Sequence, residues 1–133
     1  MSASEALKHI DFASPFDIGL RAKLIQAADT AGLDVGKGGC VGVTQGPRLE
    51  TAAEIARMER DGCDLVGMTS MPEAALAREA GMAYASLCVH SNWAAGVSSE
   101  PVTMEAIEAT LGVAMKQVRV LLESLFKEYP NVR

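Results

Sequence analysis

Three short apolar segments alternate with segments of helical character along this chain, and that alternation most limits what the chain can fold into. The apolar segments span 40–44, 64–68 and 83–89, and each is followed by a helical stretch. This order is typical of a largely parallel sheet covered by helices. A length of 133 residues suits a single domain. We therefore predict one α/β domain over residues 1–133, with a mixed, largely parallel sheet flanked by helices.

Capping residues place the helices between these segments. Asp17 is the predicted cap of the first helix, and Thr51 with Glu54 forms a capping-box pattern before the second. Pro72 lies in the first turn of the third helix, and Thr103 or a neighbour caps the last. The predicted helices span 18–31, 51–61, 72–81 and 103–127.

Composition excludes several classes of function. The net charge is −5 and no Lys/Arg stripe is present, which argues against a nucleic-acid partner. No apolar run approaches the roughly 18 residues of a membrane span, and the N-terminal residues show no secretory signal. The sequence contains 21 alanines but only 5% aromatic residues, which favours close packing of small side chains. We expect a cytoplasmic protein without a membrane partner.

The cysteines and histidines do not predict a metal site. Cys40, Cys63 and Cys88 each lie in or beside an apolar run, so we expect buried, reduced thiols. His9 and His90 have no ligand-like spacing to each other or to the cysteines. We predict no bound metal.

Polar side chains follow each predicted strand, at 44–50, 68–73 and 90–96. Ligands of open α/β sheets bind beyond the carboxyl ends of the strands. The three segments combine hydroxyl, amide and carboxylate groups with apolar side chains, as a site for a flat polar heterocycle requires. Structural interpretations also stand: Glu50 at a helix start, Thr69 and Ser70 as helix caps, Asn92 in a turn, Met68 in the core and His9 on the surface.

These segments carry a family resemblance. The stretches TQGPRLET (44–51), VGMTSMPE (66–73) and SNWAAG (91–96) resemble the trimeric purine nucleoside phosphorylase and methylthioadenosine phosphorylase family, and most of all its bacterial methylthioinosine phosphorylase branch. The resemblance covers nearly the whole chain but only the C-terminal half of the family's usual chain. It implies phosphorolysis of a purine nucleoside, with inorganic phosphate as co-substrate and no cofactor, in a homotrimer.

The resemblance assigns catalytic roles to two residues. Asn92 would donate to N7 or O6 of the purine, and Glu50 would accept from N1–H. An amide donor and a carboxylate acceptor match a 6-oxopurine. Adenine-selective relatives place aspartates where this chain has Asn92 and Ala94. We therefore expect a substrate such as methylthioinosine or inosine.

Other positions would bind the rest of the substrate. Leu49 would pack on the base, Met68 would lie under the ribose and Thr69 would bind phosphate. Ser91 and Ala94 would complete the substrate site. His9 would reach into a neighbouring subunit and cover the 5′ substituent there.

The sequence also departs from the family. Its Gly-rich phosphate loop and its Arg/His phosphate segment have no counterpart here, Val41 replaces a frequent aromatic residue, and His90 replaces an apolar one. Three hypotheses stay open: a portion of an active phosphorylase, a purine-binding fragment without turnover, and an oligomerisation module without chemistry. A sheet cut in half exposes an edge strand and apolar faces. We expect the chain to oligomerise or to pair with an N-terminal half.

Overall fold

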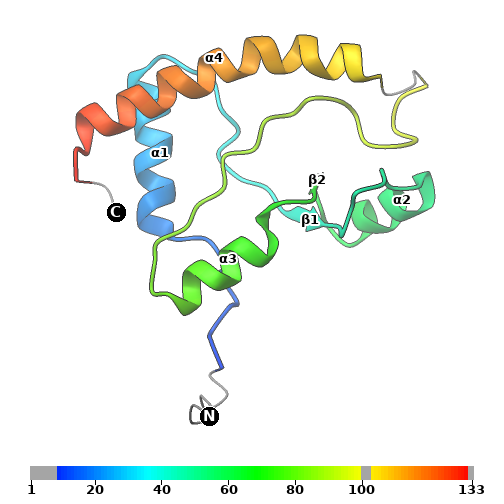
Figure 1. Ribbon diagram of the computed structural model, residues 1–133, viewed down its shortest axis with the longest axis horizontal. Helices are drawn as coiled ribbons and strands as arrows, with labels where there is room; N and C mark the ends of the chain where they lie inside the picture. Colours follow the sequence, from blue (N-terminus) through cyan, green and yellow to red (C-terminus); the bar gives the residue numbers. More distant parts are fainter. Residues whose placement is uncertain (1–8, 100–102, 132–133) are drawn as a thin grey trace, which may run out of the picture.

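The computed structural model describes residues 9–99 and 103–131 and places helices around a short pair of strands (Figure 1). A long C-terminal helix crosses the N-terminal helix, and the strand pair lies between the two middle helices. In chain order the elements are α1 (Ile18–Thr30), β1 (Val41–Val43), α2 (Ala52–Arg60), β2 (Leu65–Gly67), α3 (Ser70–Glu79) and α4 (Met104–Glu128).

The two strands run parallel, as the sequence predicts. Val41 pairs with Leu65, and Val43 pairs with Gly67. The pairing extends by one bond past the strand ends, where the Thr44 amide donates to the Gly67 carbonyl at 2.9 Å. Parallel neighbours need a crossover connection, and α2 supplies it. Its buried Met58 packs against Gly42, where an added Cβ would lie 3.1 Å from the Met58 sulfur.

The helices α1 and α4 form a core of their own. Ala27 and Ala28 of α1 are fully buried, and Leu121 and Leu125 of α4 are 2% and 4% exposed. The Tyr129 hydroxyl just beyond α4 donates to Gln26 at 2.7 Å. Paired alanines let the two helices approach closely, which agrees with the packing of small side chains predicted from composition.

The third helix is joined to the chain around it by polar and aromatic contacts. The Tyr84 hydroxyl donates to Glu73 at 2.7 Å, and its ring stacks on Phe16 with centroids 6.2 Å apart. The Asp17 amide donates to the Tyr84 carbonyl at 2.7 Å. These contacts hold the stretch after α3 against the start of α1.

The predicted third strand does not form a ladder in the described part of the chain. Residues 82–90 have no regular secondary structure, and the sheet of the described chain contains β1 and β2 alone. A strand needs a partner for its backbone groups, and no described segment lies in register beside this stretch. The third helix also begins earlier than predicted, at Ser70, with Met71 in a non-helical conformation because the residue before a proline disfavours the α region.

The prediction of buried cysteines is wrong. Cys40 and Cys88 are exposed, and Cys63 is half-buried. Partial burial and the neighbouring Cys40 thiol raise the pKa of the Cys63 thiol. Cys40 lies directly before β1, and Cys88 lies in the irregular stretch after α3. The described chain leaves both positions uncovered, so apolar surroundings in the sequence did not lead to burial.

The chain leaves much more surface exposed than a closed domain does. Its accessible surface is 9938 Å², whereas a compact monomer of 14.0 kDa exposes about 6,700 Å². Ile18, Leu49 and Trp93 are among the large apolar side chains left exposed. None of the helices described is long and apolar enough to cross a membrane.

The capping box at the start of α2 gives a stability prediction. The Thr51 hydroxyl accepts from the Glu54 amide at 3.2 Å, and the Glu54 carboxylate accepts from the Thr51 amide at 2.7 Å. Thr51→Ala removes the first of these bonds and should lower the free energy of unfolding by about 1 kcal/mol. Urea denaturation followed by circular dichroism measures it. Thr51→Ser keeps the hydroxyl and should stay close to the parent; equal loss in both variants would contradict the cap's role.

Candidate active site

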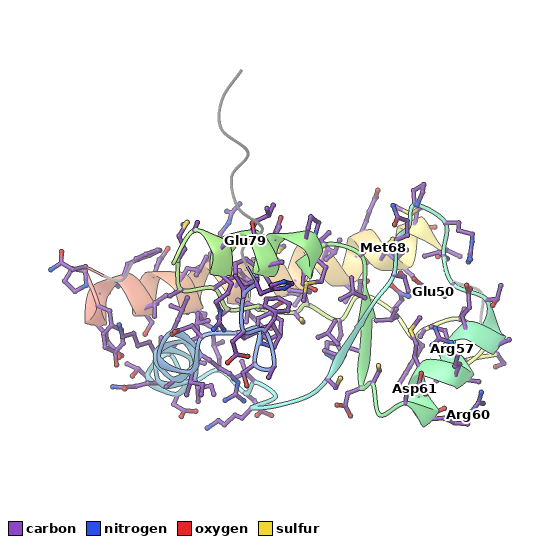
Figure 2. All side chains as sticks on the ribbon, turned by 90° about the horizontal axis from the view of Figure 1, so that it is seen from below. Glu50, Arg57, Arg60, Asp61, Met68 and Glu79 are labelled. Carbon is purple, nitrogen blue, oxygen red and sulfur yellow. The ribbon has the colours of Figure 1, made fainter. Side chains whose placement is uncertain are left out.

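The ends of β1 and β2 bring the first two predicted segments together. Figure 2 shows Glu50 and Met68 towards one end of the strand pair, with Asp61 of the crossover towards the other. The 44–50 loop and Met68 are in direct contact at Gly46, which has a φ of +64°. A Cβ at Gly46 would lie 2.7 Å from the Met68 sulfur. The positive φ favours a glycine there, and any larger residue would also displace the Met68 side chain.

A second glycine brings in the third predicted segment. Gly96 has a φ of +78°, and a Cβ on it would lie only 2.5 Å from the Cβ of Ala52. Ala52 is the first residue of α2 and follows Glu50 by two positions. The 91–96 segment thus packs on the start of the crossover helix, beside the loop that carries Glu50.

Glu50 is half-buried and is oriented by a hydroxyl. The Thr44 Oγ1 donates to Glu50 Oε1 at 2.6 Å, across the 44–50 loop. Thr44 also continues the strand pairing through its amide, so its backbone is held by the sheet. Sequence reasoning did not single out Thr44 as a site residue. The available signal was a hydroxyl at the end of a strand within the same short loop as the carboxylate.

Asn92 is exposed, and its amide is oriented by its two neighbours. Its Oδ1 accepts from Ser91 Oγ at 2.6 Å, and its Nδ2 donates to the Trp93 carbonyl at 2.8 Å. An amide nitrogen carries two hydrogens, so the bond to Trp93 uses one of them and fixes the direction of the other. Ser91 therefore helps to orient the Asn92 amide.

The remaining predicted site residues differ in exposure and in position. Thr69 is exposed and is the N-cap residue of α3, as its interpretation as a helix cap predicts, although its side chain makes no capping hydrogen bond. Leu49 is 58% exposed, and Ala94 is half-buried. His9 is exposed, and Figure 1 shows the segment before α1 running away from the strand pair. The single chain does not bring His9 to the other site residues.

A strong ion pair holds the loop next to Glu50. Arg48 donates to both oxygens of Glu54, at 2.9 and 2.8 Å. This bidentate bond and the Thr51 amide hold the pKa of Glu54 far below its usual 4.5, and the same pair raises the pKa of Arg48. The loop is thus tied to α2 on both sides of Leu49 and Glu50.

The candidate site lies outside the cavity that the helices and strands form between them. A cavity of about 1040 Å³ lies elsewhere, between α1, α4, the strands and the 85–90 stretch, and Glu50, Met68 and Asn92 do not line it. Within residues 9–99 and 103–131, no group of three or more His, Cys, Asp or Glu side chains is placed to hold a metal ion. The site offers a carboxylate, an amide and a hydroxyl beside apolar side chains.

The arrangement is that of an α/β protein in which two of the predicted segments follow the ends of parallel strands. The model of the Phosphorylase superfamily matches residues 3–127, so the chain belongs to that family. This confirms the family resemblance predicted from the three segments.

Two relatives and one solved structure show which members of the family this chain is similar to. A probable S-methyl-5'-thioinosine phosphorylase of Xanthomonas campestris is 50% identical over 92% of this chain and 50% of its own length. A probable 6-oxopurine nucleoside phosphorylase of Thermococcus kodakarensis is 38% identical over 94% of this chain and 47% of its own length. A crystal structure of the Schistosoma mansoni adenosine/methylthioadenosine phosphorylase double mutant with adenine superposes with a TM-score of 0.89 at 27% identity, covering 95% of this chain and 51% of that one. The chain spans about half the length of the proteins it matches.

The ion pair between Arg48 and Glu54 predicts a pH dependence. Because folding lowers the pKa of Glu54, its contribution to stability is present above about pH 4.5 and is lost as the pH falls below it. Glu54→Gln should remove this part of the acid sensitivity, so the parent should lose more stability than the variant between pH 6 and pH 3. Urea midpoints at both pH values measure the difference. Glu59→Gln removes a carboxylate from the same helix away from Arg48, and a matching effect there would argue against the ion pair.

Proposed function

We propose that this chain supplies the base- and ribose-binding side of a purine nucleoside phosphorylase acting on 6-oxopurine nucleosides, of which methylthioinosine and inosine are the first candidates. The proposal rests on two contacts: the loop that carries Glu50 touches Met68 at Gly46, and the segment that carries Asn92 packs on the start of α2 through Gly96. The printed names of the Xanthomonas and Thermococcus relatives support the same class of substrate.

The chemistry assigned to the site follows from its polar groups. In phosphorolysis, phosphate attacks C1′ while the bond to the base breaks, so negative charge grows on the purine. Donors aimed at that charge lower the barrier more than contacts to the ground state do. The Asn92 amide would donate to N7 or O6 of the base. Glu50, oriented by Thr44, would accept the N1–H that a 6-oxopurine carries and adenine lacks.

The sugar and phosphate would lie beyond the base. Met68 would pack under the ribose, and the Thr69 hydroxyl, which makes no helix-capping bond, would donate to phosphate. A phosphate normally takes several donors or a cation. Further phosphate-binding groups would have to come from elsewhere, and the reaction would use phosphate as co-substrate with no other cofactor. His9 would serve a neighbouring subunit in an oligomer, which we expect to be a trimer.

A second function, purine binding without turnover, rests on a specific observation. The chain corresponds to about half the length of its relatives, and one threonine is the predicted phosphate ligand. The decisive experiment measures hypoxanthine release from methylthioinosine by the purified chain. It is run with and without phosphate, alone and with the half of the Xanthomonas relative that this chain does not match. Phosphate-dependent release supports the phosphorylase, binding without release supports the second function, and absence of purine binding overturns both.

The base preference predicts the effect of changing Asn92. Asn92→Asp replaces a donor by an acceptor, so hypoxanthine should bind about 10- to 100-fold more weakly, as expected for an unsatisfied polar contact of about 1–3 kcal/mol. Adenine, which offers an amino group at the same position, should gain relative to hypoxanthine. Isothermal titration calorimetry with both bases measures this.

Asn92→Ala is the matched control for that change. It removes the donor without adding an acceptor, so hypoxanthine binding should fall while adenine binding does not improve. If Asn92→Asp and Asn92→Ala affect the two bases alike, Asn92 does not contact the base edge.

A further inference from the structure

Two cysteines lie next to each other where the chain enters the strand pair. Cys40 lies directly before β1, and Cys63 lies two residues before β2. The Cys40 amide donates to Asp64 Oδ2 at 2.7 Å, and the Asp64 amide donates back to the Cys40 carbonyl at 2.8 Å. The Leu65 amide donates to the same carbonyl at 3.1 Å. These three bonds hold the backbone of Cys40 against the residues that follow Cys63.

The side chains of the two cysteines share one face of the strand pair. A Cβ on Gly42 would lie 3.1 Å from Cys63 Sγ, so the Cys63 thiol fills the space that this glycine leaves over β1. Alternate residues of an extended chain share a face, which places Cys40, two residues before Gly42, on the same side. Burial, the Cys40 charge and a hydrogen bond with the Cys40 thiol raise the pKa of the Cys63 thiol. The two thiols therefore interact directly in the reduced chain.

The two thiols differ in their access to solvent. Cys40 is exposed, whereas Cys63 is half-buried. Oxidation of cysteine begins at an exposed thiolate and ends in a disulfide where a second thiol is within reach. Cys88 is also exposed, but its sulfur contacts the Ser86 hydroxyl oxygen, at 3.4 Å. The chain thus contains an exposed thiol beside another thiol and an exposed thiol beside a hydroxyl.

We propose that Cys40 and Cys63 form a redox-active dithiol, which a hydroperoxide converts into an intramolecular disulfide. With hydrogen peroxide, the Cys40 thiolate attacks one peroxide oxygen and the O–O bond breaks. Cys40 becomes a sulfenic acid, and the leaving hydroxide takes up the proton of the Cys40 thiol to give water. The Cys63 sulfur then attacks the sulfenic sulfur, the S–S bond forms, and the sulfenic hydroxyl leaves with the Cys63 proton as a second water. Two thiols are oxidised by two electrons, and one peroxide is reduced to two waters.

The disulfide closes the crossover 41–62 into a covalent loop. Glu50 lies within that loop, at its other end from the two cysteines. Figure 2 shows Asp61, two residues before Cys63, far from Glu50 and Met68 along the strand pair. A cross-link removes entropy from the unfolded chain, so the oxidised form should unfold at a higher urea concentration. The inference concerns thiol chemistry away from the candidate site, so it stands apart from the proposed activity.

Trypsin separates the three cysteines and so allows a direct test. Cleavage after lysine and arginine places Cys40, Cys63 and Cys88 in the peptides 38–48, 61–78 and 79–116. The purified chain is treated with a small excess of hydrogen peroxide, blocked with iodoacetamide, digested without reductant and analysed by mass spectrometry. Peptide 38–48 linked to 61–78 is expected from the monomer, and dithiothreitol should release it. It should form about tenfold faster than any linked peptide that contains Cys88.

Serine variants identify the role of each thiol. Cys40→Ser and Cys63→Ser should each abolish the linked peptide, whereas Cys88→Ser, the matched control, should leave its rate of formation within about twofold. In Cys63→Ser, dimedone should trap a sulfenic acid at Cys40. Oxidation should raise the urea midpoint of the parent and of Cys88→Ser but not that of Cys63→Ser. Far-ultraviolet circular dichroism checks that each variant is folded.

Several results would overturn the inference. One is linkage through Cys88 at a similar rate, and another is a link between 38–48 and 61–78 that is found in dimers alone. A third is oxidation of Cys40 and Cys88 to the same extent with no linked peptide. An equal rise of the urea midpoint in Cys63→Ser would show that the cross-link is not its cause. None of these measurements uses a purine, so their outcome is separate from that of the activity assay.

Discussion

The parallel pairing of β1 with β2 determines where the candidate site lies. Parallel neighbours cannot be joined by a tight turn, so the chain must leave β1, form a helix and return before β2 begins. That path places the 44–50 loop and Met68 at the same edge of the pair. Thr44 links the strand pair to the candidate site, because its amide extends the pairing and its hydroxyl orients Glu50.

The elements that were predictable from the sequence are those with local causes. The capping box of Thr51 and Glu54, the cap at Asp17 and the apolar runs of β1 and β2 all act within a few residues, and the structure contains each of them. The stretch 83–89 has the same apolar character, yet it forms no ladder, because a strand is defined by a partner that can lie far away in the chain. The exposed cysteines follow from the same cause, since burial depends on what covers a segment and not on the segment itself.

The candidate site was predictable in its parts but not in its connections. The three segments that carry Glu50, Met68 and Asn92 were recognised from sequence, and the comparisons confirm their family. The contacts that join the segments are long-range and rest on small residues, as at Gly46 against Met68 and at Gly96 against Ala52. Sequence reasoning identifies candidate ligand groups more readily than residues such as Thr44, which orients Glu50 through a hydrogen bond.

The packing of α1 on α4 has a consequence for how the chain folds. The bond between Gln26 and Tyr129 joins residues 103 positions apart, and α1 packs on α4 at a similar separation in the chain. Closing a loop of that length costs about 4 kcal/mol of chain entropy before any contact compensates for it. The crossover from β1 to β2 spans far fewer residues. The unit formed by β1, α2 and β2, which carries the Glu50 loop, should therefore assemble first. The contact between α1 and α4 should form last.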